Sequence, residues 1–286
     1  MSSPSKKTWF ITGCDSGMGH AVAQVVLECG DAVVLTARDP RNIEALLKAY
    51  PDTAHGYALD VTDTERIAQV TSAAIKATGG IDVLLNNAGY GLLGAVEESS
   101  ADEYRPMFEV NFFGLAAVTK ALLPHMRERG SGHIFNTSSL GGYAASAGFA
   151  FYAASKFAVE GFSQALAQEV APFGVKVMIV EPGAFRTLFS GASLKKPTHS
   201  ISAYDQTPLR ATQERISQRN GSQPNDPRRL GQVLYRLSRM TDLPLRLPLG
   251  EDALARVRTQ VASASAEFEA WKETTLSVAF DAPPLN

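Results

Sequence analysis

The stretch ITGCDSGMGH, residues 11–20, decides the fold of this chain. It continues the apolar run WFIT (9–12) and leads into a helical pattern near 19–29. Glycines at positions 13, 17 and 19 let the backbone turn sharply and approach a ligand closely, and a helix N-terminus offers unpaired N–H groups to a phosphate. A dinucleotide-binding fold holds its pyrophosphate at this point, although the spacing here is not the common G-x-G-x-x-G. A glycine-rich turn that serves only packing is the alternative.

Strand-sized apolar runs alternate with helical patterns along most of the chain. Most runs are continuously apolar, as in strands that are buried on both faces of a parallel sheet. The runs lie at 9–12, 32–37, 56–60, 82–89, 133–139 and 175–183, and the helical patterns lie near 19–29, 41–49, 63–78, 101–129 and 150–172. This order predicts an α/β fold, a doubly wound parallel sheet of the Rossmann type with helices on both faces.

The polar segment 190–226 interrupts this alternation. A connection of that length inside a compact domain is usually a functional lid or a disordered segment. We expect a single dinucleotide-binding catalytic domain over residues 1–286, with a substrate lid inserted at about 188–226. Regular structure is expected to resume at Asp226-Pro227 with a helix to about Met240, followed by a strand in 243–250 and a helix over 251–272.

Composition narrows the possible partners. The net charge is -2 and the pI is near 6.2, so no global field recruits nucleic acid or acidic membranes. No apolar run reaches the roughly 18 residues that a membrane helix needs, and no signal peptide is evident, so we expect a cytoplasmic protein without a membrane partner. The 2 cysteines and 5 histidines lack ligand spacing, and no metal site is predicted.

The end of the second strand bears on the choice of nucleotide. An NAD site usually carries a carboxylate there, whereas an NADP site needs a cation. The sequence VVLTARDP (33–40) places Arg38 at this point, and a guanidinium can bind a 2′-phosphate in bidentate fashion. Asp39 would serve the ribose instead if the strand ended one residue later. NADP(H) is therefore favoured, with NAD(H) as the alternative. Asp60, after the third strand, either accepts a hydrogen bond from the adenine amino group or is a cap or turn residue.

The stretch YAASK (152–156) places Tyr152 and Lys156 one helical turn apart on the same face. An isolated pair of this kind is usually a packed tyrosine beside a surface lysine. A neighbouring ammonium would instead stabilise a phenolate and lower the tyrosine pKa from its ordinary value near 10. Such a phenol can give its proton to the alkoxide-like oxygen that hydride reduction of a ketone creates.

With these motifs the chain resembles the short-chain dehydrogenase/reductase family, closely over residues 8–188 and more loosely beyond. The motifs occur in the family's order: TGCDSGMG (12–19), LDVTD (59–63), NNAG (86–89), EVNFFG (109–114), NTSS (136–139), YAASK (152–156) and EPGAFRT (181–187). The resemblance is strongest to single-domain carbonyl reductases and hydroxysteroid- or retinol-type dehydrogenases.

The resemblance implies roles for matching positions. Tyr152 would be the acid–base residue, Lys156 its partner, Ser139 a donor to the substrate carbonyl, and Asn111 the anchor of a proton-relay water. Asn86 is expected with Ala88 and Gly89 along the adenosine and nicotinamide-ribose side, and Thr187 at the carboxamide. The cofactor-binding residues predicted in all are Gly13, Asp15, Ser16, Gly17, Met18, Gly19, Arg38, Asp60, Val61, Asn87, Ala88, Gly89, Tyr152, Lys156, Pro182, Gly183, Phe185 and Thr187.

The expected activity is reversible NADP(H)-dependent reduction of an apolar ketone or aldehyde to the alcohol. The predicted pocket walls are Gly141, Gly142, Tyr143, Phe149, Phe185, Leu188 and Phe189. No cationic side chain is convincingly aimed at a substrate carboxylate, and Arg186 is the only candidate. An NAD-dependent secondary-alcohol or hydroxysteroid-type dehydrogenase is an alternative, as is a non-catalytic dinucleotide-sensing protein. The family usually forms homodimers or homotetramers through the helices here predicted at 101–129 and 150–172. Phenylalanines 112, 113, 157 and 162 would serve either that interface or the core.

Overall fold

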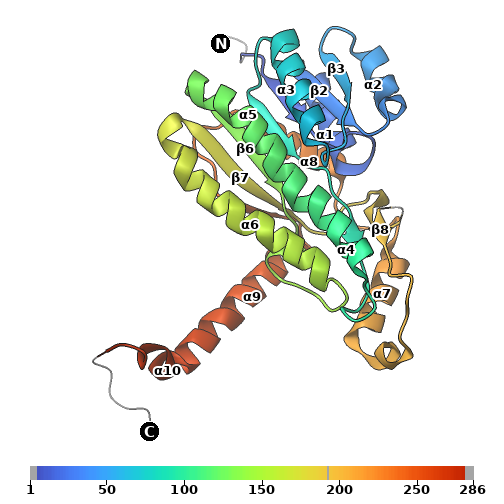
Figure 1. The fold of residues 1–286 in the computed structure, drawn as a ribbon, viewed down its shortest axis with the longest axis vertical. Coiled ribbons are helices and arrows are strands. Elements are labelled where there is room, and N and C mark those ends of the chain that lie inside the picture. Colours follow the sequence, from blue (N-terminus) through green and yellow to red (C-terminus); the bar gives the residue numbers. More distant parts are fainter. Residues whose placement is uncertain (1–4, 192, 281–286) are drawn as a thin grey trace.

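The computed structural model describes residues 5–191 and 193–280. Seven parallel strands form one sheet in the order β3-β2-β1-β4-β6-β7-β9 (Figure 1). Their bounds are β1 (Thr8–Ile11), β2 (Ala32–Ala37), β3 (Ala54–Ala58), β4 (Val83–Asn86), β6 (Gly132–Thr137), β7 (Val175–Pro182) and β9 (Arg246–Leu249). The strand order reverses between β1 and β4, so the predicted doubly wound sheet is confirmed.

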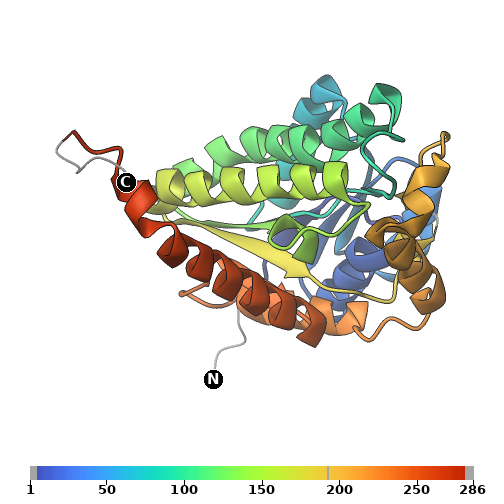
Figure 2. The same cartoon turned by 90° about the horizontal axis from the view of Figure 1, so that it is seen from below.

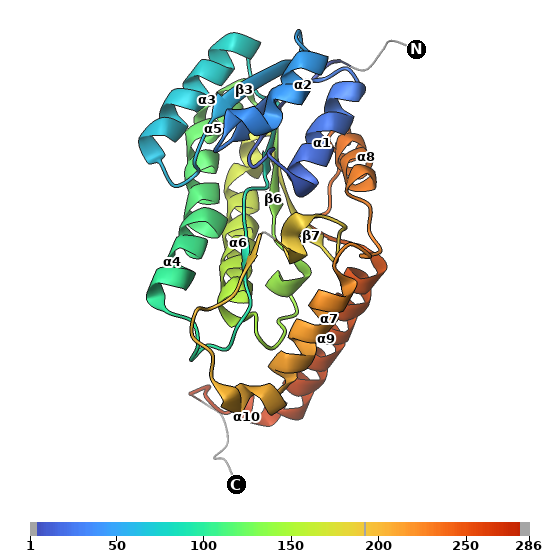
Figure 3. The same ribbon diagram turned by 90° about the vertical axis from the view of Figure 1, so that its right-hand side faces the viewer.

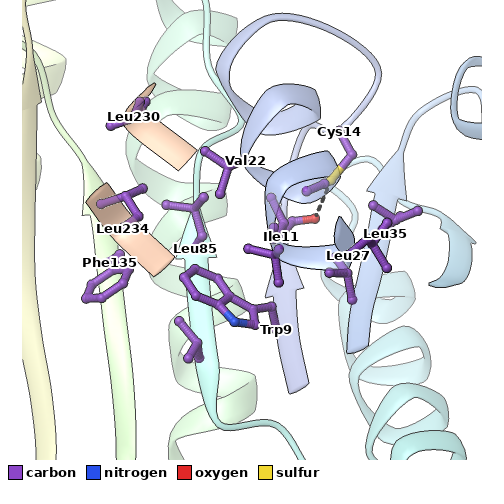
Figure 4. Packing of buried hydrophobic residues seen from close by; sticks show 14 of the residues in the cluster. Trp9, Ile11, Cys14, Val22, Leu27, Leu35, Leu85, Phe135, Leu230 and Leu234 are labelled. Atoms are coloured by element: carbon purple, nitrogen blue, oxygen red, sulfur yellow. Dashed lines mark hydrogen bonds between the residues drawn. The ribbon is translucent and has the colours of Figure 1, made fainter. Parts of the chain in front are cut away.

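Helices cover both faces of this sheet (Figure 2). The helices α1 (Gly17–Glu28) and α8 (Pro227–Leu237) close one face, and α3 (Thr64–Thr78), α5 (Leu115–Arg129) and α6 (Ala150–Val170) close the other. Successive side chains of a strand point to opposite faces. Trp9 and Ile11 therefore pack under α1 and α8 (Figure 4), whereas Phe10 packs toward α3 and α5.

Shorter elements complete these layers. They are η1 (Pro40–Ile43), α2 (Glu44–Ala49), η3 (Leu140–Gly142) and η4 (Ala171–Phe173). The predicted helix over 101–129 is one continuous helix made of α4 (Ala101–Phe108), the π-helical η2 (Glu109–Gly114) and α5. By length and composition alone it would suit a bilayer. In the fold, Leu115, Val118 and Leu122 are buried on it, as expected for a core helix.

The predictions for the C-terminal part are largely confirmed. The carboxylate of Asp226 accepts a hydrogen bond from the Arg228 backbone N–H, and Pro227 opens α8, which ends at Leu237, three residues before the expected end. The strand β9 and the helix α9 (Glu251–Ala270) follow, and α10 (Lys272–Leu276) continues the chain. The far end of α9 extends away from the sheet (Figure 1).

The expectation that regular structure resumes only at Asp226 is wrong. The lid segment contains η5 (Leu188–Ser190), β8 (Leu194–Lys195), η6 (Ser202–Gln206) and the 12-residue helix α7 (Pro208–Arg219). The strand β8 pairs with β5 (Gly91–Leu92) in a separate two-stranded sheet. Leu209 of α7 is buried against Leu93 and Phe149, and such tertiary packing, more than local propensity, stabilises a short helix. Pro208 at the first helical position was a local signal of this helix.

Candidate active site

The glycine turn forms a cradle between β1 and α1. Gly13 and Gly17 have φ of 71° and 62°, which favour glycine, and a Cβ atom on Gly19 would lie 2.2 Å from the Gly13 carbonyl oxygen. Ser16 at the N-cap makes no side-chain hydrogen bond to α1, and the first turn has no acidic residue. The N-terminal N–H groups and the positive end of the helix dipole thus favour an anion at this turn.

A cavity of about 240 Å³ adjoins the cradle. It brings together most of the predicted cofactor residues: Gly13, Asp15, Ser16, Gly17, Met18, Arg38, Asp60, Val61, Asn87, Ala88, Gly89 and Thr187. Gly19 lies under the turn, and Tyr152, Lys156, Pro182, Gly183 and Phe185 line a second, larger cavity that shares Met18, Asn87, Gly89 and Thr187 with the first. These residues fit an extended dinucleotide, whose two halves would occupy the two cavities.

The two charged residues after β2 lie in different surroundings. The carboxylate of Asp39 accepts hydrogen bonds from Arg41, with Nε 2.9 Å from each oxygen, and it also accepts from the Arg41 backbone N–H. Arg38 is exposed and lines the smaller cavity, which Asp39 does not. Of these two residues, only the cation Arg38 lines the smaller cavity.

Two polar residues differ in part from their expected roles. Asp60 lines the smaller cavity and also holds a turn, because its Oδ1 accepts from the Thr62 N–H (2.9 Å) and hydroxyl (2.8 Å). Asn86 lines neither cavity, so the expectation for it is wrong. It is 2% exposed, and its Nδ2 donates to Thr119 and Asn136 inside the core. Asn87 faces the site instead, and its Nδ2 donates to the Thr12 and Gly13 carbonyls.

Helix α6 places Tyr152 and Lys156 at the mouth of the larger cavity. Lys156 Nζ donates to the Thr137 carbonyl (2.9 Å) and lies 6.0 Å from the centre of the Tyr152 ring. Ser139 follows β6, its Oγ accepts from the Gly141 N–H, and it lines the same cavity. Three polar side chains, one after β6 and two on α6, therefore line the same cavity.

Asn111 lies behind this group on η2. Its Oδ1 accepts from the Tyr90 N–H, and its Nδ2 donates to the Tyr90 carbonyl (3.0 Å) and to Ser155 Oγ (3.1 Å). A Cβ atom on Gly89 would lie 3.0 Å from Asn111 Oδ1 and 3.6 Å from Lys156 Nζ, so both side chains flank Gly89. Asn111 lines neither cavity, and its part in a proton relay stays a prediction.

The protein's own groups do not lower the pKa of Tyr152 as expected. Burial raises this pKa to about 12, and only a hydrogen bond with Ser139 opposes the rise. The reason lies with Lys156, whose ammonium is bound to Thr137 and whose own pKa burial lowers to about 8. Tyr152 is thus a neutral phenol near neutral pH, which is the form that donates a proton.

The larger cavity measures about 680 Å³. Of its predicted walls, Gly141, Phe149, Phe185 and Phe189 line it, Leu188 lines the smaller cavity, and Gly142 and Tyr143 line neither.

Arg186, the only candidate cation for a substrate carboxylate, lines neither cavity. Its Nε and Nη2 both donate to the Gln223 carbonyl, at 3.2 Å and 3.1 Å. Sequence reasoning missed Arg215, Arg219 and Arg256, which do line the larger cavity. Arg215 and Arg219 are four residues apart, which places them on the same face of a helix, and this spacing was the available signal in the sequence.

Comparison with known proteins agrees with this geometry. Residues 7–197 match the family model described as short chain dehydrogenase. Oxidoreductase BOA17 of Botryotinia fuckeliana is 38% identical over 274 residues, which cover 96% of this chain and 99% of the relative. The 3-ketodihydrosphingosine reductase of Bacteroides thetaiotaomicron is 37% identical over 242 residues, or 84% of this chain and 86% of the relative.

Solved structures show the same architecture. A short-chain dehydrogenase from Streptomyces avermitilis superposes with a TM-score of 0.90 at 42% identity, covering 96% of this chain and 100% of that one. ElxO with NADP bound superposes with a TM-score of 0.72 at 26% identity, covering 88% and 100% of the two chains. The cradle, the paired cavities and these likenesses lead to one conclusion: the chain belongs to the short-chain dehydrogenase family and is an oxidoreductase with a nicotinamide dinucleotide cofactor.

Proposed function

We propose that this protein reduces an apolar ketone or aldehyde to the alcohol, reversibly and with NADP(H). The observation that carries the proposal is the position of Ser139, Tyr152 and Lys156. They lie where a mostly apolar cavity of about 680 Å³ meets the dinucleotide cradle. Buried donors beside a mostly apolar volume suit a substrate whose reacting polar atom is a carbonyl oxygen.

The residues of the chain supply the hydrogen-bond donors and the proton for the reduction, and bound NADPH would supply the hydride. Ser139 and the Tyr152 phenol each carry a hydroxyl that can donate to the carbonyl oxygen, and two donors stabilise the negative charge that develops there. Tyr152 then releases its proton to that oxygen. Lys156, whose pKa is lowered to about 8 by burial, keeps a positive charge near neutral pH. In the proposed reaction its ammonium turns from the Thr137 carbonyl towards the phenolate once the proton has left, and stabilises it there.

The preference for NADP(H) rests on the residues after β2. Arg38 borders the smaller cavity, where a 2′-phosphate would gain charge-assisted hydrogen bonds. The NAD-dependent alternative would need a carboxylate there, but Asp39 is engaged by Arg41. Reduction as the direction agrees with the name of the Bacteroides relative, a ketone reductase. The presence of both Tyr152 and Lys156 weighs against a protein that only senses dinucleotide.

The test follows cofactor oxidation with a panel of apolar ketones and aldehydes, using NADPH and NADH in parallel. We expect NADPH to be preferred, and the Tyr152→Phe variant to lose turnover while it still binds NADPH. Tyr143 is partly buried near η3 but lines neither cavity, so Tyr143→Phe is the matched control and should keep full activity. A preference for NADH would overturn the cofactor assignment, and retained activity in Tyr152→Phe would overturn the role of the phenol.

A further inference from the structure

The charged residues that line the larger cavity are mostly cations. Lys156 lies at the catalytic end, and Arg215 and Arg219 of α7 and Arg256 of α9 line it as well. Asp252 is the one acidic residue among the lining residues that the structure describes. The rest of the lining is largely apolar or small. Such an excess of positive charge is unusual for a pocket that binds only an apolar compound.

One face of α7 makes this wall. The residues of α7 that line the cavity are Pro208, Ala211, Thr212, Arg215, Ile216 and Arg219, which recur at the spacing of a single helix face. Near its start, Leu209 packs with Phe149, whose ring centre is 5.7 Å from that of Tyr152. At about 1.5 Å of rise per residue, Arg215 and Arg219 lie about 9 Å and 15 Å further along the helix axis than Leu209. Along α7 the wall therefore changes from small side chains at Pro208, Ala211 and Thr212 to the cations Arg215 and Arg219.

Within residues 5–191 and 193–280, no acidic side chain forms an ion pair with these arginines. No ion pair involves Arg215, Arg219 or Arg256, whereas Arg210, also on α7, pairs with Glu214 at 3.1 Å. Arg256 donates to Ser146 Oγ and to the Ala144 and Ala145 carbonyls, all neutral acceptors. The carboxylate of Asp252 is held by the Ala184 N–H and by Asn225.

Arg215 and Arg256 also lie close enough to repel one another. Burial, and after it the positive charge of Arg215, lowers the pKa of Arg256, while Asp252 opposes this. Like charges at one cavity wall cost stability unless a ligand of opposite charge joins them. Asp252 is the one acidic side chain of the lining, and no described carboxylate forms an ion pair with Arg215 or Arg219. A guanidinium fork matches a carboxylate in bidentate fashion. Figure 3 shows that α7 and α9 lie at the same end of the molecule.

We propose that the substrate carries a carboxylate, separated from its carbonyl by an apolar chain or ring system, and that Arg215 and Arg219 bind this carboxylate. The inference rests on the proposed reductase function of the same site and specifies its substrate class. Arg256, which is tied to Ser146 and to backbone carbonyls, adds positive charge and shapes the wall. The lid helix is then a specificity element, because it holds the cations at a fixed distance from Tyr152.

The kinetic test compares a medium-chain methyl ketone that ends in a carboxylate with the methyl ester of the same compound. In the wild type, kcat/KM should favour the carboxylate by about tenfold or more. The double variant Arg215→Gln, Arg219→Gln should lose about 10- to 100-fold of kcat/KM for the carboxylate and almost nothing for the ester. Arg210→Gln, on the same helix but paired with Glu214, is the matched control and should behave as the wild type. Equal use of acid and ester, or equal losses on both, would overturn the proposal.

A binding test separates this inference from the reductase function. Calorimetry of decanoate and decanol in the presence of NADPH needs no turnover. Decanoate should bind more tightly than decanol, and the double variant, but not Arg210→Gln, should weaken decanoate binding about tenfold or more. If binding depends on the arginines but no carbonyl compound is reduced, the reductase proposal fails and the carboxylate site stands. If decanoate binds equally to all three proteins, the carboxylate site is refuted.

Discussion

Two buried carboxylates share one arginine beside the active-site helix, and replacing one of them should stabilise the protein above neutral pH. Glu181, at the end of β7, is 0% exposed, and neither of its carboxylate oxygens has a hydrogen-bond partner among the described residues. Arg246 Nε is 3.0 Å from Glu160 Oε2 but 3.8 Å from Glu181 Oε1. Burial, and then the charge of Glu160, raises the pKa of Glu181 to about 7, and Arg246 opposes the rise.

The expected magnitude follows from that pKa. An acid whose pKa is higher in the folded protein stabilises the fold below its unfolded pKa, and this contribution is lost as pH rises through the folded pKa. Each tenfold change in proton affinity corresponds to about 1.4 kcal/mol. A rise of the Glu181 pKa from 4.5 to about 7 therefore corresponds to about 3 kcal/mol of folding free energy. Glu181→Gln removes the ionisation, although its amide loses the attraction of Arg246. We therefore expect a gain of about 1–3 kcal/mol near pH 8 and no gain near pH 5.

The assay is urea unfolding of wild type and variant, followed by circular dichroism, at intervals from about pH 5 to about pH 8. The quantity to compare is the difference between their free energies of unfolding, because groups that do not interact with Glu181 titrate equally in both. Glu169→Gln, an exposed position on α6, is the control and should change the difference by no more than a few tenths of a kcal/mol at any pH. If Glu181→Gln raised the free energy of unfolding equally at about pH 5 and at about pH 8, the reasoning would be refuted. A lower free energy of unfolding in the variant near pH 8 would refute it as well.

Three further predictions concern the cofactor and assembly. Arg38→Ser should lower kcat/KM for NADPH about 10- to 100-fold with little effect on NADH, and an unchanged ratio of the two cofactors would contradict the role of Arg38. In Gly19→Ala, the added Cβ would lie 2.2 Å from the Gly13 carbonyl oxygen and 2.4 Å from Asn87 Nδ2. The variant should lose about 1–3 kcal/mol of stability and bind NADPH more weakly in a fluorescence titration, whereas wild-type affinity would show that the turn has room. Phe113 and Phe157 are 51% and 49% exposed on the two long helices. Phe157→Glu should therefore reduce self-association in light scattering, and a monomeric wild type would refute this interface.

The sequence by itself determined the sheet and the pairing of Tyr152 with Lys156, because both depend on local regularities. Continuous apolar runs separated by helical patterns leave few arrangements other than a doubly wound parallel sheet. The glycines after β1 are needed for backbone reasons that hold wherever a strand turns into a helix so tightly. Tyr152 and Lys156 share a helix face by spacing alone, so any helix over 150–170 brings them together.

Only the tertiary structure decided what depends on contacts between distant residues. The helix α7 is stabilised by the packing of Leu209 against Leu93 and Phe149. The sequence of α7 alone is too polar to predict a buried face. Asn86 and Asn87 are adjacent in a motif, but the alternation of the strand sends the first into the core and leaves the second at the cofactor cradle.

The electrostatics of the site were decided in the same way. The pKa of Tyr152 rises because burial outweighs the hydrogen bond with Ser139, while the ammonium of Lys156 is bound to the Thr137 carbonyl. A spacing in the sequence does not measure burial. The three arginines of the larger cavity come from α7 and α9, elements that the sequence does not place together. Periodicity is a property of neighbours along the chain, whereas desolvation and charge clustering are properties of neighbours in space.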